Sequence, residues 1–263
     1  MATSRFVTVN RATDSGTGVV TVGFAGATSM NLLDSAVIEE LTERFGDLAG
    51  DPGARVVVLR GAGDRAFIGG ADIKEMATLD RETGETFIRR LAGLCDAIRE
   101  CPVPVIARLA GWCLGGGLEV AMACDLRVTG DGARFGMPEI TIGIPSVIHA
   151  ALMPALIGAS RAAWLQLTGE IIDAGTAEQW GLVHKVVPGG RLDAEIAGLA
   201  AKLAGFGPEA VRQQKRLLNR WFDLPASDAV EDSVERFASA FLTGEPQHYM
   251  ARFLERRARK PRA

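Results

Sequence analysis

Runs and repeats of apolar residues predict strands and helices in turn along the first half of the chain. Short strands are predicted at 6–9 and 19–24, and the turn residues between them favour a hairpin. Apolar residues then recur at helical spacing over 37–48, behind a candidate helix cap at Asp34. The uninterrupted apolar run at 56–59 is typical of a strand that is covered on both faces, as in a parallel sheet.

The same alternation of strand and helix continues as far as residue 129. A long glycine-rich loop is predicted at 61–72, followed by a helix whose apolar positions span 87–98. The next strands are predicted at 103–109 and 126–129, and Pro104 suggests that part of the first of these lies at a sheet edge. Strands that alternate with helical crossovers indicate an α/β core.

Beyond residue 146 the pattern becomes mostly helical. Ser160 and Asp173 are candidate helix caps in this part of the chain. The glycine- and proline-rich segment Gly205-Phe206-Gly207-Pro208 then marks a boundary between two parts of the chain. It divides the chain into an α/β core at 1–205 and a C-terminal helical region at 206–263.

Composition and charge narrow the class of protein. The chain has 263 residues, of which 48% are hydrophobic, enough for a sizeable globular core. Its net charge of -3 argues against a general nucleic-acid binder, although basic residues crowd the chain from Arg252 onward. The N-terminus lacks an apolar secretory core, and no uncharged run reaches the ~18 residues of a membrane span. We therefore expect a soluble cytoplasmic protein.

The cysteines and histidines give no sign of a metal or disulfide site. The four cysteines form no Cys-x-x-Cys pair and three of them lie in apolar runs, which favours buried thiols in a reducing compartment. The three histidines are scattered and lack metal-ligand spacing.

Two glycine-rich turns follow predicted strands, one at 69–72 and one at 115–117. α/β folds place ligands beyond the carboxyl ends of their strands, where both turns are expected. Each turn can offer backbone N–H groups to a negative charge, and two converging donors would make an oxyanion hole. Tight turns and close packing explain most single glycine clusters, so the glycines alone leave the structural interpretation open.

Two glutamates stand in apolar surroundings. Glu119 lies within an apolar helical run just after the second glycine turn, and Glu139 lies between Pro138 and Ile140. A surface acid or an ion-pair partner is the ordinary explanation for either one alone. Together they could flank one water, one as acid and the other as base, because apolar surroundings raise a carboxyl pKa.

Other catalytic motifs are not supported. The chain lacks both the Gly-Lys-Ser/Thr ending of a phosphate loop and the Gly-x-Ser-x-Gly elbow of a serine hydrolase. Ser146 and His149 lie three residues apart on a predicted helix, but without an evident third member chance explains their spacing better than a catalytic pair does.

Several motifs, in order and at matching spacing, resemble those of the enoyl-CoA hydratase/isomerase (crotonase) family. Residues 66–76 are similar to the family's first signature, 110–125 to its second, 135–139 to its third and 167–183 to the following block. The resemblance covers nearly the whole chain. It implies an α/β fold, a spiral of ββα turns, with a helical C-terminal region that assembles a trimer or a dimer of trimers.

The resemblance also implies the chemistry. The substrate would be an acyl-CoA thioester, with coenzyme A as part of the substrate and with no separate cofactor or metal. The N–H groups of Ala71 and Gly116 would bind the thioester oxygen, while Glu119 and Glu139 would activate water and move the proton at C2. The protein would then be an enoyl-CoA hydratase, a lyase of fatty-acid or lipid metabolism that converts a 2-enoyl-CoA into a 3-hydroxyacyl-CoA. Many isomerases of the family keep only the second acid, so the pair favours hydration over the alternative, isomerisation or other enolate chemistry.

The residues implied to bind coenzyme A or the acyl group come from both ends of the chain. They are Gly70, Asp72, Ile73 and Lys74 at the first turn, Ser146 at the acyl end, and Phe253 and Arg256 on the C-terminal helix, often supplied by a neighbouring subunit in the family.

Two segments depart from the family pattern. Residues 143–149 lack the usual glycines, so the bulkier Ser146 and Val147 are expected to reshape the acyl site. Residues 27–31 stand where the family usually has a proline followed by a basic residue. The missing basic residue predicts the loss of one contact with a phosphate group of coenzyme A. A different class of function, RNA binding through the basic C-terminus, is disfavoured by the negative net charge and by the intact acid pair.

Overall fold

The structure is a computed structural model that describes residues 5–11 and 17–258. Within these residues the larger of two sheets has six strands. Their order is β1 (Val7–Arg11), β2 (Val19–Phe24), β3 (Val56–Gly61), β5 (Val105–Leu109), β7 (Leu126–Gly130) and β10 (Lys185–Val187). The first pair is antiparallel, as expected for a hairpin, and the remaining pairs are parallel.

The smaller sheet is built by the same turns of the chain. Its order is β4 (Ala66–Ile68), β6 (Trp112–Leu114), β8 (Arg134–Gly136) and β9 (Ile171–Asp173). Each turn of the chain places one strand in each sheet, β3 then β4, β5 then β6, and β7 then β8. The expected α/β spiral of ββα turns is thereby confirmed.

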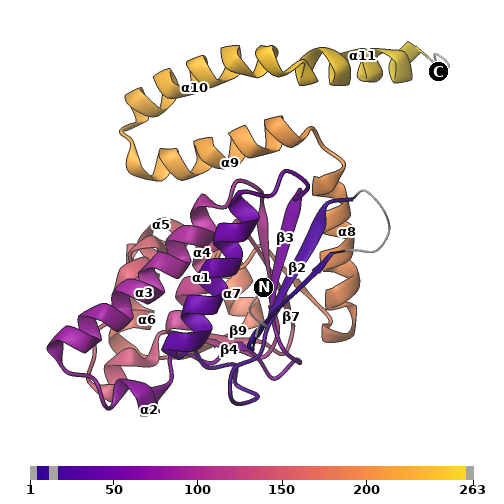
Figure 1. Ribbon diagram of the computed structural model, residues 1–263. Helices are drawn as coiled ribbons and strands as arrows, with labels where there is room; N and C mark the ends of the chain where they lie inside the picture. The colour runs from indigo at the N-terminus through magenta and orange to yellow at the C-terminus, as the bar shows by residue number, and fades with distance from the viewer. Residues whose placement is uncertain (1–4, 12–16, 259–263) are drawn as a thin grey trace.

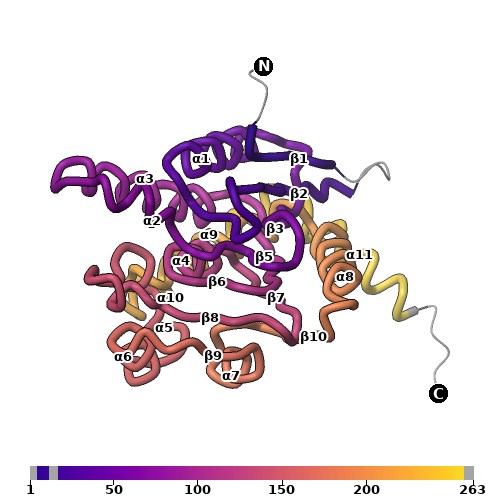
Figure 2. The backbone as a smooth tube through the Cα atoms, turned by 90° about the horizontal axis from the view of Figure 1, so that it is seen from below, coloured from indigo at the N-terminus to yellow at the C-terminus, as the bar shows by residue number. Residues whose placement is uncertain are grey.

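Helices cover the larger sheet on both faces (Figures 1 and 2). The helices α1 (Ser35–Ala49), α3 (Arg81–Glu100) and α4 (Gly116–Ala123) lie on one face, over the larger apolar core. Helix α8 (Leu192–Ala204) lies on the other face, over a second and smaller core. Every residue of α4 is buried, so this short helix passes through the middle of the molecule.

The other helices connect the sheets or follow them. Shorter helices lie at intervals along the chain before α8. Among them are α2 (Ile73–Met76), the 3-10 helices η1 (Pro138–Ile142) and η2 (Ile148–Leu152), and α5 (Met153–Ile157), α6 (Ala159–Thr168) and α7 (Ala174–Trp180). Three long helices end the chain, α9 (Pro208–Asp223), α10 (Ala226–Ala240) and α11 (Glu245–Ala258). In Figure 1, α10 and α11 run in one line above α9, on the side away from the sheets. None of the helices described is long and apolar enough to cross a membrane.

Three details of the sequence-based prediction were wrong, and one was incomplete. The expected loop at 61–72 contains β4. The chain beyond residue 146 is mostly helical as expected, but it also contains the short strands β9 and β10. Strands of three residues are too short to show a period-2 pattern, and their pairing across the sheet stabilises them instead. Strand β5 is central rather than at an edge, because Pro104 precedes it and offers only its carbonyl, which accepts from the Val57 N–H at 2.8 Å. Helix α6 starts from Gly158 without a side-chain cap, not from Ser160.

The other two predicted caps and the cysteines agree with the prediction. Asp34 accepts a hydrogen bond from the Val37 N–H and caps α1, and Asp173 caps α7 in the same way through Thr176, both at 2.8 Å. All four cysteines are buried and free.

Candidate active site

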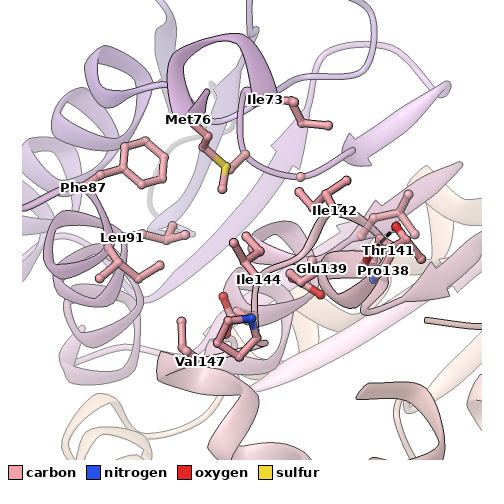
Figure 3. Close-up of a pocket in the computed structure, with 18 of the residues that line it drawn as sticks. Ile73, Met76, Phe87, Leu91, Pro138, Glu139, Thr141, Ile142, Ile144 and Val147 are labelled. Carbon is pink, nitrogen blue, oxygen red and sulfur yellow. Dashed lines mark hydrogen bonds between the residues drawn. The ribbon is translucent and has the colours of Figure 1, made fainter. Parts of the chain in front are cut away.

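A cavity of about 280 Å³ opens where the glycine turns after β4 and β6 meet α2, α3 and η1 (Figure 3). Its lining side chains are apolar except for the Thr141 hydroxyl and two carboxyl groups, Glu119 and Glu139. The lining residues are Gly69, Gly70, Ala71, Ile73, Met76, Phe87, Ile88, Leu91, Leu114, Gly115, Gly116, Glu119, Pro138, Glu139, Thr141, Ile142, Ile144, Pro145 and Val147. The two glycine turns and the two acids that the sequence singled out therefore share one cavity.

Glu119 projects from the buried helix α4 into this cavity. Its side chain is almost fully buried, with 3% of the residue exposed, and its Oε1 accepts a hydrogen bond from the Ala150 N–H at 2.9 Å. Burial raises the pKa of Glu119 to about 8, against the lowering effect of the Ala150 bond and with a smaller raising effect from the charge of Glu139. With this raised pKa, Glu119 is mostly protonated near neutral pH.

Glu139 enters the cavity from η1, directly after Pro138. Its Oε2 accepts a hydrogen bond from the Ser146 hydroxyl at 2.9 Å. Burial raises the pKa of Glu139, and hydrogen bonds from its own backbone and from Ser146 oppose that rise. The two acids are thus unequal, since two hydrogen bonds favour the ionised form of Glu139 and one favours that of Glu119, and Glu119 is the more deeply buried.

The remaining oxygen of each acid lies beside the second glycine turn. A Cβ atom on Gly115 would come within 2.6 Å of Oε1 of Glu139, and one on Gly116 would lie 4.0 Å from Oε2 of Glu119. Apart from the hydrogen bond that Glu139 receives from its own backbone, neither of these oxygens has a donor in another residue within the described part of the chain. Gly115 also has a φ of +53°, so glycine is required there both by the backbone and by the approach of Glu139. Two carboxyl oxygens that no other described residue binds can together hold a small polar molecule such as water at this turn.

The same turns present two backbone N–H groups to the cavity. Gly116 is the first residue of α4, so its N–H has no acceptor in the helix and stands at the positive end of the helix dipole. On the first turn, Gly70 and Asp72 both bond to Leu33, through the Gly70 carbonyl at 3.0 Å and the Asp72 N–H at 2.8 Å. The Ala71 N–H between them finds no acceptor among residues 5–11 and 17–258. Two such donors beside an acid pair can stabilise an oxyanion.

The segment that ends at Asn31 packs against the first glycine turn. Asn31 is buried, and its Nδ2 donates to the carbonyls of Ala62 and Ala66 at 3.0 and 2.7 Å. Its φ of +50° belongs to the left-handed region, which asparagine tolerates better than most residues. The Gly69 N–H bonds to the Met30 carbonyl at 2.8 Å. The segment at 27–31 therefore braces the turn that carries Ala71.

The structure brings together most of the residues that the sequence proposed for the first turn. Gly70, Ala71 and Ile73 line the cavity. Asp72 and Lys74 do not; the Asp72 carboxylate caps α2 by accepting from the Lys74 N–H at 2.8 Å.

The other proposed residues lie elsewhere. Phe253 and Arg256 are exposed on α11, which lies far from α2 in Figure 1, and the basic residues after position 258 fall outside the described residues. Ser146 is absent from the cavity lining and reaches Glu139 instead. The predicted helix through Ser146 and His149 was wrong, because η2 begins at Ile148, and His149 turns its Nε2 toward Asp96 at 3.3 Å.

Sequence reasoning missed two parts of the site. The apolar wall combines Phe87 and Leu91 of α3, which the helical pattern marked only as core positions, with Ile142 and Ile144 near Glu139 (Figure 3). The Ala150 N–H that bonds Glu119 is a backbone group, and a backbone donor leaves no signal in the residue type.

Glu119→Gln is expected to remove part of the pH dependence of stability. Because burial raises the pKa of Glu119 from 4.5 to about 8, the folded chain keeps a proton that the unfolded chain loses. The free energy of unfolding should therefore fall as pH rises through this interval, and the glutamine variant should show a flatter slope. Urea unfolding at several pH values and one protein concentration measures both slopes; equal slopes would contradict the assigned proton.

Comparison with known proteins gives one consistent result. The family model described as enoyl-CoA hydratase/isomerase matches residues 14–261. A protein of Mycobacterium bovis named probable enoyl-CoA hydratase is 37% identical over 249 residues, which cover 93% of this chain and 94% of the relative. A short-chain-enoyl-CoA hydratase of Clostridium acetobutylicum is 34% identical over 230 residues, covering 87% and 88%.

A solved structure agrees over nearly the same length. The crystal structure of an enoyl-CoA hydratase from Bacillus anthracis superposes with a TM-score of 0.91 at 31% sequence identity. The match covers 96% of this chain and 97% of that one. Sequence and fold therefore point to the same group of proteins.

Proposed function

The chain belongs to the enoyl-CoA hydratase/isomerase family, and from that premise we propose that it is an enoyl-CoA hydratase. It adds water across the C2=C3 double bond of a 2-enoyl-CoA and releases a 3-hydroxyacyl-CoA. One observation carries the proposal: one oxygen of Glu119 and one of Glu139 lie beside the second glycine turn, where the Gly116 N–H has no acceptor among the described residues. The relatives named as hydratases support the same reaction.

The first step is attack of water on C3. The Glu139 carboxylate takes a proton from the water as its oxygen bonds to C3. The electrons of the C2=C3 bond move toward the thioester, and its oxygen becomes an enolate oxygen that accepts from the N–H groups of Ala71 and Gly116. The N-terminus of α4 stabilises the same negative charge, because the positive end of its dipole points there.

The second step is protonation of C2. The Glu119 carboxylic acid supplies this proton, and the enolate electrons return to form the C2–H bond. Glu119 has then lost one proton and Glu139 has gained one, so the pair carries a single proton before and after the reaction. A pair with one proton supplies an acid and a base at once, which two ionised carboxylates could not do.

Coenzyme A is proposed to leave the cavity past α2. Ile73 lines the cavity and is 58% exposed, so it stands at the mouth, and Asp72 and Lys74 flank it on the surface. Phe253 and Arg256 are proposed to meet the coenzyme from a neighbouring subunit, since α11 of the same chain lies far from this mouth.

The test of the proposed function is a direct assay. Crotonyl-CoA and a series of longer 2-enoyl-CoAs are supplied to the purified protein, and loss of the conjugated enoyl-thioester absorbance is followed. Turnover on at least one chain length is expected. Absence of turnover on the whole series, with the protein folded by circular dichroism, overturns the proposal.

Residues 206–263 are proposed to form an assembly region beside the core at 1–205. Their helices expose an apolar stripe on α10, in which Val230, Val234 and Phe237 recur at helical spacing and are 64%, 58% and 70% exposed. A second copy of the chain is the proposed cover for this stripe, in a trimer or a dimer of trimers.

Phe237→Asp is expected to reduce the assembly to a smaller species. A charge within the stripe would have to be buried without a partner when subunits associate. Light scattering coupled to gel filtration measures the mass, and Glu235→Lys on the opposite side of α10 serves as the control for a change of charge. A wild-type protein that elutes as a monomer would contradict the assembly.

A further inference from the structure

We propose that Ser146 is a positioning residue for the acid pair: its hydroxyl fixes Glu139 so that one carboxylate oxygen faces the reacting water. The proposal rests on the proposed function, because it concerns the same two glutamates. It assigns to Ser146 a role different from the acyl contact that the sequence suggested. Ser146 bonds to the base and does not line the cavity, so it acts through Glu139.

Contacts at both of its oxygens set the orientation of the Glu139 carboxyl group. The Ser146 hydroxyl donates to Oε2 at 2.9 Å, which leaves Oε1 over Gly115, where a Cβ atom would come within 2.6 Å. A carboxylate with one oxygen held by a hydroxyl cannot rotate freely about its last bond. Ser146 is the only side chain among the described residues that donates to the Glu139 carboxyl group.

The same short segment also holds the other acid. Four residues after Ser146, the Ala150 N–H donates to Oε1 of Glu119 at 2.9 Å. Val147, between these two contacts, lines the cavity. The segment at 146–150 therefore bonds one oxygen of each glutamate and places an apolar side chain between the two bonds. This arrangement sets the two free oxygens relative to each other.

The segment holds its shape against a local cost. Ile148 has a φ of +39°, which is unfavourable for a β-branched residue. Neighbouring contacts impose this conformation, since the Ala150 N–H also bonds to the Val147 carbonyl at 2.9 Å and His149 lies 3.3 Å from Asp96 of α3. A backbone segment whose conformation is fixed by such contacts can hold the two glutamates in accurate positions.

The groups around Glu139 indicate how the hydrogen bond from Ser146 affects its ionisation. Among the residues that line the cavity, Glu119 on α4 is the other titratable group, and Ser146 is the side chain from the 143–149 segment that reaches Glu139. An O–H donor stabilises the ionised form of a carboxyl group. Together with the hydrogen bond from its own backbone, the Ser146 hydroxyl therefore favours the ionised form of Glu139, which accepts the proton from water, against the effect of burial.

The kinetic test compares Ser146→Ala with Ser146→Thr. The alanine variant is expected to lose about tenfold or more in kcat, the scale of a lost hydrogen bond to a charged group, with little change in KM. The acid limb of its pH–rate profile should move to higher pH, because the pKa of Glu139 rises without the donor. Threonine keeps the hydroxyl and should restore kcat and the wild-type acid limb. Ser227→Ala, which removes a hydroxyl bonded to the Asp228 carboxylate on α10, is the matched control.

A second measurement tests the bond without relying on catalysis. Infrared spectra taken across a pH titration follow the band of protonated carboxyl groups, and Glu139→Gln identifies the contribution of Glu139. The Glu139 band should appear at higher pH in Ser146→Ala than in the wild-type protein. An unchanged titration, or an unchanged kcat in a wild-type protein that does hydrate enoyl-CoA, overturns the role of Ser146 and leaves the proposed function standing. A protein without hydratase activity in which the titration does move would overturn the function alone.

Discussion

Glu119→Gln and Glu139→Gln are each expected to lower kcat for hydration by about 100- to 10,000-fold, the usual contribution of a positioned acid or base. Glutamine keeps the shape of the side chain and its Oε1 can still accept the bond from Ala150 or Ser146. What it loses is the ability to take or give a proton. Either change therefore breaks the one-proton pair while leaving the cavity intact.

The two variants also separate hydration from isomerisation. An isomerase that moves its proton with Glu139 alone would keep most of its rate in Glu119→Gln, whereas a hydratase needs both acids. Initial rates with an active 2-enoyl-CoA, compared with Glu43→Gln on the exposed face of α1, measure the loss. A Glu119→Gln enzyme near the wild-type rate would contradict the mechanism proposed for the pair.

Gly116→Pro is expected to lower kcat by about 100- to 1,000-fold, as for the loss of one oxyanion-hole donor. Proline has no N–H, and it fits the first position of a helix because that N–H is unused by the helix itself. The substitution therefore deletes the donor proposed for the enolate oxygen with little demand on α4.

Gly116→Ala is the matched control for this change. A Cβ atom at this position meets the end of the Leu91 side chain at 2.9 Å, so both variants push on Leu91, but only alanine keeps the N–H. The rate of the proline variant should fall well below that of the alanine variant, with both proteins folded. Equal rates in the two would show that the Gly116 N–H is not a catalytic donor.

The sequence predicted the parts of the fold that have long or continuous patterns. Helix α1 with its Asp34 cap and strand β3 with its buried run follow from local pattern and capping chemistry. Strands β9 and β10 could not be predicted in this way, because each has three residues and exists through pairing with distant partners. The central place of β5 likewise depends on strand order, which no local pattern encodes.

The candidate site was predictable where a residue is out of place in its surroundings. Glu119 stood out because a carboxyl group on an apolar helix is costly to bury, and it is indeed buried beside the cavity. The partners of the acids were not predictable. The Ala150 N–H is a backbone group, and Ser146 carries a common side chain whose contact with Glu139 arises from the path of the 143–149 segment.

The most direct test of the central claim is the mass of the product formed in water labelled with heavy oxygen. We expect a 3-hydroxyacyl-CoA that carries one labelled oxygen, because the proposed mechanism makes the water activated by Glu139 the hydroxyl group at C3. A product with the unchanged mass of the substrate would indicate isomerisation. A free acid that carries the label would indicate hydrolysis of the thioester, and either result would contradict the account given for this site.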